Sequence, residues 1–208
     1  MSEFKVIGVD FSLNGTGLAV YTENHTITNQ FVYSLKKSDR AEVITIPKIE
    51  EQADKIDWVC NSIAEIAIKE NVSFVCMEDH TGSYYSWMDG YAVLKHLFRQ
   101  ANIPYIAIAP TSLKKYVISG KADKNQMAYQ LRKEYGLDFD YLGECADNIV
   151  DASWLAIFGK DYYSKYILGR SFPKLFPKER VASLEKILKG KNNKWQISKQ
   201  QNYKKREI

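Results

Sequence analysis

The segment that most constrains the fold is the run from Phe4 to Tyr21, which reads as two apolar strands joined by a tight turn. The first strand ends at Asp10, and Ser, Asn, Gly and Thr residues follow it. Packing explains this acid poorly, because burying an unpaired carboxylate costs several kcal/mol or more. An Asp that merely forms the turn is the ordinary alternative. A carboxylate that binds a metal ion is the interpretation that we favour.

The rest of the chain predicts an α/β fold. Apolar, β-type runs predict further strands at 26–35, 72–78 and 104–109. From Ile49 the apolar residues recur in steps of four and three, which predicts a helix. Further helices are expected at 87–101, 111–119, 123–136, 144–165 and 178–189. Residues 36–47 are polar and contain a proline, so we expect a loop there. This order predicts a mixed sheet with helices on both faces.

Charge is distributed unevenly along the 208 residues. The formal net charge is +4, yet residues 186–208 alone contain eight Lys or Arg residues and one Glu. We therefore expect a main domain at 1–169 and a basic, partly helical or flexible extension at 170–208. A basic extension on a mildly acidic body suggests a polyanionic partner, although a solvated tail is the plain alternative.

Several classes of protein are disfavoured. No stretch of about 18 apolar residues occurs, so no membrane-spanning helix is expected. The first residues do not resemble a secretion signal, which predicts a cytoplasmic protein. The three cysteines, Cys60, Cys76 and Cys145, form no CxxC pair. We expect them to be reduced and buried.

Three further acids stand in positions as unusual as that of Asp10. Glu78 ends the apolar run 72–78, and Asp147 and Asp151 lie on one face of the helix expected at 144–165. Carboxylates that converge where strands end would repel unless a cation neutralises them, and oxygen ligands favour Mg²⁺ or Mn²⁺. The alternatives are a salt bridge for Glu78 and a favourable interaction with the helix dipole for Asp147.

Four segments in order resemble the RuvC-type Holliday junction resolvases, which are ribonuclease-H-like nucleases, and the phage-encoded branch in particular. These are the run 8–17, the strand ending at Glu78, the Pro/Lys-containing run 109–127 and the acidic helix 147–156. The resemblance implies a ribonuclease-H-like mixed sheet, with three antiparallel strands followed by parallel ones. It also implies a Mg²⁺-dependent endonuclease for branched DNA that leaves 5′-phosphate ends. Were the chain phage-encoded, the bacterial host cell would be its location.

The resemblance assigns roles to individual residues. Two Mg²⁺ ions, for which Mn²⁺ would substitute, are expected on four acids: Asp10, Glu78, Asp147 and Asp151. Lys124 is expected to neutralise the phosphate at the site as a catalytic residue. Two departures from the family stand out. The family usually has an acid where Asn148 lies, which leaves open whether Asp147 or Asn148 completes the metal site, and Lys121 replaces a usual glycine.

DNA contacts are expected around this site. The candidates are Lys114, Lys115, Lys121, Lys124, Tyr84 and Tyr85. The loop 79–87 follows an acid-bearing strand, so its aromatic side chains are candidates for stacking on opened bases. Tyr85 and Trp87 have an alternative role as anchors of the next helix or of a dimer. His80 is a weaker candidate for a general base.

A four-way junction needs two symmetric nicks, so a homodimer is expected, with the apolar helix 87–101 as its interface. Its candidate interface side chains are Trp87, Met88, Tyr91, Val93, Leu94, Leu97 and Phe98.

Three other functions compete with junction resolution. Sugar kinases and actin-like ATPases also open with an Asp and a Gly/Thr turn, but they need two such domains. Another ribonuclease-H-like nuclease acting on RNA or flap structures fits the same motifs. A junction-binding protein that does not cleave is disfavoured because the acids at 10, 78 and 151 are retained.

Overall fold

The computed structural model describes residues 3–24, 27–79, 85–172 and 177–189, and the side chains of 27–29, 85–88 and 187–189 are not described. Within these residues six strands form one sheet in the order β4-β3-β2-β1-β5-β6. The strands are β1 (Lys5–Asp10), β2 (Gly15–Thr22), β3 (Ile27–Ser34), β4 (Val43–Thr45), β5 (Phe74–Glu78) and β6 (Tyr105–Ile108). β1, β2 and β3 are antiparallel neighbours, whereas β5 runs parallel to β1 and β6 runs parallel to β5. The predicted mixed sheet is confirmed.

β4 corrects the expectation that residues 36–47 are only a loop. It pairs in parallel with β3, with Val43 opposite Val32, and the Val32 amide donates to the Glu42 carbonyl oxygen at 2.8 Å. Three residues are too few to show the alternation that identifies a strand. The strand forms because the outer edge of β3 offers unpaired backbone groups.

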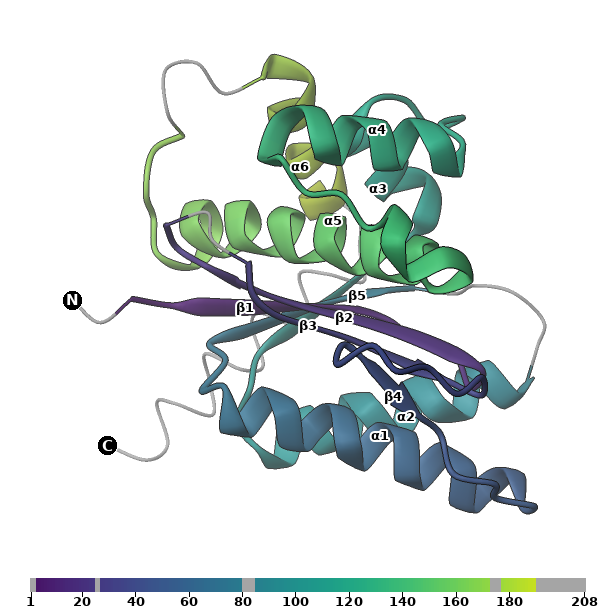
Figure 1. Ribbon diagram of the computed structural model, residues 1–208. Coiled ribbons are helices and arrows are strands. Elements are labelled where there is room, and N and C mark those ends of the chain that lie inside the picture. The colour runs from purple at the N-terminus through teal and green to yellow at the C-terminus, as the bar shows by residue number, and fades with distance from the viewer. Residues whose placement is uncertain (1–2, 25–26, 80–84, 173–176, 190–208) are drawn as a thin grey trace.

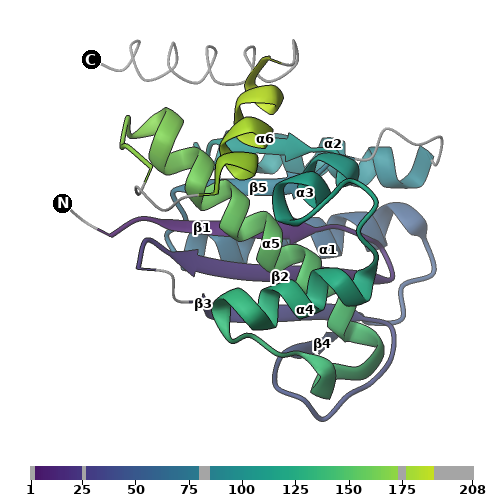
Figure 2. The same cartoon turned by 90° about the horizontal axis from the view of Figure 1, so that it is seen from above.

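Helices cover both faces of the sheet (Figure 1). They are α1 (Gln52–Lys69), α2 (Tyr85–Gln100), α3 (Pro110–Val117), α4 (Lys124–Tyr135), α5 (Ala146–Tyr162) and α6 (Lys178–Lys189). α1 and α2 lie on one face, and α5 crosses the other face with α3, α4 and α6 gathered around it (Figures 1 and 2). A short 3-10 segment, η1 (Asp140–Cys145), precedes α5, and one π turn, η2 (Tyr163–Ile167), follows it. Each predicted helix is confirmed to within a few residues at its ends.

The sheet separates two apolar cores. One lies beneath α5 and contains Trp154 and Phe158, and the other lies beneath α1 and α2. The second core takes up the side chains of Tyr91, Leu94 and Phe98 from α2. These three residues therefore pack inside their own chain, which corrects their assignment to a dimer interface.

The other four residues of the predicted interface give the dimer assignment little support. Val93 and Leu97 pack partly buried against the same core. The side chains of Trp87 and Met88 lie outside the described residues. Periodicity indicated an apolar face correctly, but it cannot tell a face that packs on the chain's own sheet from one that packs on a partner.

α5 lies against β1 and β2 at very close range. A Cβ atom at Gly8 of β1 would overlap the carbonyl oxygen of Ala152, and one at Gly17 of β2 would overlap that of Asn148. Both glycines are therefore required by the approach of a helix backbone to the sheet. This contact fixes the height of the acidic first turns of α5 above the end of β1.

The described part of the C-terminal extension packs on the main domain. Leu184 of α6 is fully buried, and Arg180 donates to both carboxylate oxygens of Glu134 in α4 at 2.7 and 2.6 Å. The boundary expected between 169 and 170 stays a prediction. Residues 190–208, which carry half of the Lys and Arg residues of the extension, lie outside the described residues.

The three cysteines are free thiols, with Cys60 and Cys76 buried and Cys145 partly exposed. No helix among the described residues combines the length and apolar character needed to cross a bilayer.

Candidate active site

Two of the predicted acids meet at one edge of the sheet. Asp10 is the last residue of β1 and Glu78 is the last residue of β5. The two strands are parallel neighbours, with Val9 opposite Met77, so their carboxyl ends lie side by side. α5 begins above the same edge, on the right-hand side in Figure 1. The fold thereby brings together acids that are 68 and more residues apart in the sequence.

Asp10 is at the centre of the cluster electrostatically. Burial raises the pKa of its carboxyl group well above its usual value. The charges of Glu78 and Asp151 and a hydrogen bond with the Glu78 carboxyl group raise this pKa further, and the charge of Lys124 opposes them. A carboxylate with such surroundings is costly when ionised, so it calls for a proton or a cation.

Asp151 is the acid of α5 that belongs to this cluster. Burial and then the charge of Glu78 raise its pKa to about 6, against the opposing charges of Lys124 and Lys114. Its side chain stands one helical turn beyond Asp147, whose charge raises the pKa of Asp151 further. Asp10, Glu78 and Asp151 thus form one interacting set from three separate elements.

Asp147 is placed differently from these three. Its carboxylate accepts a hydrogen bond from Lys124 Nζ at 2.7 Å, and 44% of the Asp147 side chain and 69% of that of Lys124 are exposed. Lys124 is the first residue of α4, whose start is fixed by a capping box between Asp123 and Gln126. The Lys124–Asp147 ion pair therefore forms the solvent-exposed rim of the acid cluster.

The side chain of Asn148 points to Gly15, the first residue of β2. A Cβ atom at Gly15 of β2 would lie 2.8 Å from the Nδ2 atom of Asn148, so the amide rests over the turn between β1 and β2. Of the two candidates for completing the site, Asp147 carries the ion pair with Lys124 and Asn148 faces Gly15.

The donor set suits a hard divalent cation. Asp10, Glu78 and Asp151 offer only carboxylate oxygens, the ligands that Mg²⁺ and Mn²⁺ prefer. Among the described residues, no three potential ligands already stand in metal-binding geometry. The carboxyl groups of Asp10 and Glu78 lie within hydrogen-bond distance of each other, an arrangement that requires a proton between them. A bound cation would replace that proton.

The predicted DNA contacts lie around the same edge. Lys114 and Lys115 are in the last turn of α3, and the charge of Lys114 reaches Asp151. Lys121 is exposed in the segment between α3 and α4. His80 and Tyr84 fall outside the described residues, as does the side chain of Tyr85, the first residue of α2. Their proposed contacts with DNA stay predictions.

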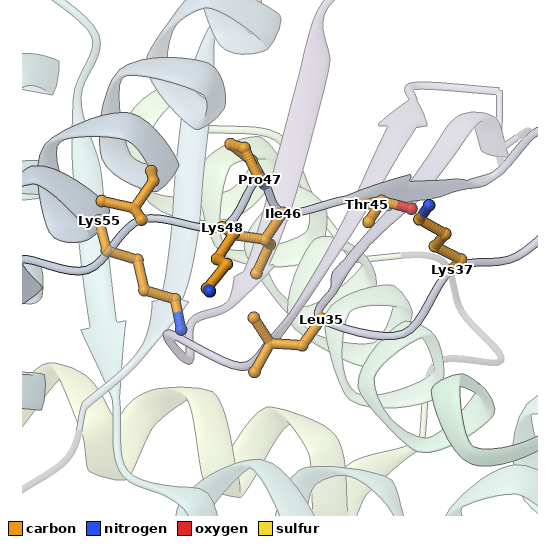
Figure 3. A pocket seen from close by; sticks show the side chains of 8 residues that line it. Leu35, Lys37, Thr45, Ile46, Pro47, Lys48 and Lys55 are labelled. Carbon is orange, nitrogen blue, oxygen red and sulfur yellow. The ribbon is translucent and has the colours of Figure 1, made fainter.

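Sequence reasoning missed a pocket of about 370 Å³ near this edge (Figure 3). Its lining residues are Leu35, Lys37, Thr45, Ile46, Pro47, Lys48, Ile49 and Lys55. They come from the segment after β3, from the end of β4 and the segment that follows it, and from the start of α1, and they follow no motif. The missed strand β4 is what brings them together, so no signal in the sequence indicated the pocket.

The sheet order and the crossing of α5 over β1 and β2 are those of the ribonuclease-H-like fold. Solved structures with this arrangement include Thermus thermophilus RuvC, which is 16% identical with a TM-score of 0.57 over 80% of this chain and 97% of that one. T. thermophilus RuvC in complex with a Holliday junction substrate gives 17% identity and a TM-score of 0.57 over 74% and 91%.

A third structure of this fold is the yeast mitochondrial Holliday junction resolvase Ydc2, at 14% identity and a TM-score of 0.50 over 73% of this chain and 75% of that one. No protein-family model matches the sequence, and no curated protein matches it. At these identities the likeness defines the fold, and the predicted fold class is confirmed.

Proposed function

We propose that this protein is a structure-selective DNA endonuclease that resolves four-way or branched DNA junctions. The observation that carries the proposal is the convergence of Asp10, Glu78 and Asp151 at the ends of β1 and β5 and the start of α5, where the pKa values of the Asp10 and Asp151 carboxyl groups are raised. Perturbed acids that cluster at one place are typical of a catalytic or metal site. The fold is shared with solved junction resolvases, one of them in complex with a Holliday junction substrate.

The proposed reaction is hydrolysis of a phosphodiester bond. Two Mg²⁺ ions, replaceable by Mn²⁺, would supply an activated water and stabilise the leaving oxygen. Water adds to phosphorus while the bond to the 3′ oxygen breaks, and a proton passes to that oxygen, which yields 5′-phosphate and 3′-hydroxyl ends. Asp10, Glu78 and Asp151 would hold the ions. Lys124, at the exposed rim, would neutralise the phosphate.

Substitution of the acids tests the metal chemistry. Asp10→Asn, Glu78→Gln and Asp151→Asn should each abolish nicking of a four-way junction in Mg²⁺ and leave junction binding largely intact. Binding depends on lysines and cleavage on the acids, so the two activities separate. Lys69→Gln, at the far end of α1, is the matched control and should cleave normally. Full cleavage by an acid variant would remove that residue from the site.

The substrate class needs a comparison of nucleic acids in one assay. A four-way junction, a duplex, a flap and an RNA–DNA hybrid at equal concentration should be nicked with a clear preference for the junction. A preference for the flap or the hybrid would instead favour another nuclease of this fold. Binding without cleavage in Mg²⁺ or Mn²⁺ would favour a protein that only binds junctions.

The active form is proposed to be a homodimer, because a junction with two-fold symmetry requires two nicks and each chain carries one site. The interface must use surfaces other than Tyr91, Leu94 and Phe98, which are buried within the chain. Light scattering should give a dimer on the junction. A monomer both free and on the junction would contradict this.

A further inference from the structure

The pocket of Figure 3 is lined by two kinds of side chain. Leu35, Ile46, Pro47 and Ile49 give it an apolar lining, and its ionisable residues are Lys37, Lys48 and Lys55. No acid is among the described residues that line the pocket, although Glu50 and Glu51 follow closely in the sequence. The combination of apolar surface with positive charge matches a ligand that carries both phosphates and apolar sugar or base surface.

The lysines of the pocket have few charged partners in the part of the chain that the structure describes. In Figure 3 the amino groups of Lys48 and Lys55 extend over the same space, next to Leu35. The side chains of Lys37 and Lys48 have no carboxylate partner among the described residues. Partial burial lowers the pKa of Lys55. An anion placed between these amino groups would be stabilised by more than one of them.

The pocket opens at the same edge of the sheet as the acid cluster. Lys55 Nζ donates to Asn14 Oδ1 at 2.9 Å, and Asn14 belongs to the turn that directly follows Asp10. On another side, Lys36 pairs with Glu144 of η1, two residues before the start of α5. The pocket thus lies near the segments that follow β1 and precede α5, two of the three elements that carry the acids of the site. A polymer lying across this edge would reach the pocket and the acids together.

We propose that this pocket is a subsite for one DNA strand beside the scissile phosphate. Lys48 and Lys55 would hold backbone phosphates, Lys37 would hold the next phosphate along, and Leu35 and Pro47 would contact sugar or base. The inference rests on the proposed function and extends it to a surface that the sequence motifs do not include. Figure 3 shows the Lys37 amino group beside Thr45, apart from those of Lys48 and Lys55, so a free mononucleotide would not reach all three lysines and the occupant is a polynucleotide strand.

Neutral substitutions and salt dependence test the subsite. Junction binding is measured in EDTA, to prevent cleavage, for Lys48→Gln, for Lys37→Gln with Lys48→Gln, and for the control Lys69→Gln. Lys69 is exposed at the opposite end of α1. Log affinity falls as log salt rises, and removing one lysine–phosphate interaction should make this slope less steep by about 0.9. Between 50 and 200 mM salt the double variant should therefore lose about tenfold less affinity than the wild type.

A second variant tests the apolar part of the pocket. Half of the Leu35 surface is exposed (50%), so Leu35→Ser should fold normally. It should weaken junction binding at all salt concentrations and leave the salt slope unchanged. Unchanged affinity in Leu35→Ser would overturn the assignment of sugar or base to this surface.

The outcomes separate this inference from the proposed function. A wild type that binds and nicks junctions, with Lys48→Gln indistinguishable from Lys69→Gln, would overturn the subsite and leave the nuclease standing. A wild type that neither binds nor nicks branched DNA would overturn both. Melting temperatures within a degree or so of the wild type would confirm that the lysine variants are folded.

Discussion

The carboxyl groups of Asp10 and Asp151 make the metal-free protein sensitive to pH. Both have raised pKa values, so the folded state binds more protons than the unfolded chain over a window that for Asp151 runs from 3.8 to about 6. Stability must therefore fall as pH rises through this window. For Asp151 alone the rise in pKa corresponds to about 3 kcal/mol of unfolding free energy.

Urea unfolding in EDTA at pH 4.5 and 7.5 checks this expectation. Between pH 4.5 and pH 7.5 the wild type should lose more free energy of unfolding than Asp151→Asn loses, because the amide does not ionise. Mg²⁺ at pH 7.5 should restore stability to the wild type, since a ligand that binds only the folded state stabilises it. The same pH dependence in both proteins would show that Asp151 ionises freely in the fold.

The Lys124–Asp147 ion pair raises the question of whether Asp147 positions Lys124 or binds a metal ion. The side chains of Lys124 and Asp147 are 69% and 44% exposed, so the pair adds little to stability. We expect Asp147 to position Lys124, and Asp147→Asn to slow cleavage by about 10–100-fold, the usual effect of losing a supporting partner. Asp151→Asn should lose far more activity.

Single-turnover rates in a double-mutant cycle decide between positioning and metal binding. In a Lys124→Ala background, Asp147→Asn should add little if Asp147 acts through Lys124. If Asp147 is a metal ligand, its full effect will persist in that background and the dependence on Mg²⁺ concentration will change as well.

At the scale of elements, the acid-bearing strands could be predicted because each has an unmistakable local pattern. β1 and β5 are apolar runs ending in an acid, and α5 opens with Asp147 and Asp151. What the sequence did not indicate depends on distant contacts. β4 exists only because β3 has a free edge, and the direction of Asn148 depends on the glycine at position 15.

The contact between α5 and the sheet is the element-scale feature on which the site depends. Gly8→Ala would drive a methyl group into the Ala152 carbonyl, next to Asp151. We expect destabilisation of about 1–3 kcal/mol, as for other overpacked sites. Cleavage should fall more than the folded fraction does, because the helix acid moves away from Asp10.

Gly15→Ala is the matched control for this prediction. Its methyl group meets only the flexible end of the Asn148 side chain, which can rotate away. Melting temperature and cleavage rate should both stay near the wild type. Gly8→Ala with normal stability and normal cleavage would show that α5 can shift without harm to the site.

At the scale of the whole molecule, the basic C-terminal extension has two parts. One part, α6, is anchored on the main domain, and the other, residues 190–208, lies outside the described residues. The anchored part is α6, where Leu184 is fully buried and Arg180 pairs with Glu134 while its guanidinium stacks over the Tyr116 and Trp154 rings. Deleting residues 177–208 should therefore lower the melting temperature sharply, because it opens the core beneath α5.

Deleting only residues 191–208 should weaken DNA binding without lowering the melting temperature. This segment holds six Lys or Arg residues with Trp195 and Tyr203 and too few apolar residues for a core of its own. We expect an unchanged melting temperature, weaker junction binding and a flatter salt dependence, because fewer counterions are released from the DNA. Cleavage at saturating protein should stay near that of the full chain, since the acids and Lys124 are untouched. A truncated protein that is insoluble, or that melts as early as the 177–208 deletion, would mean that Trp195 and its neighbours complete the fold rather than hold DNA.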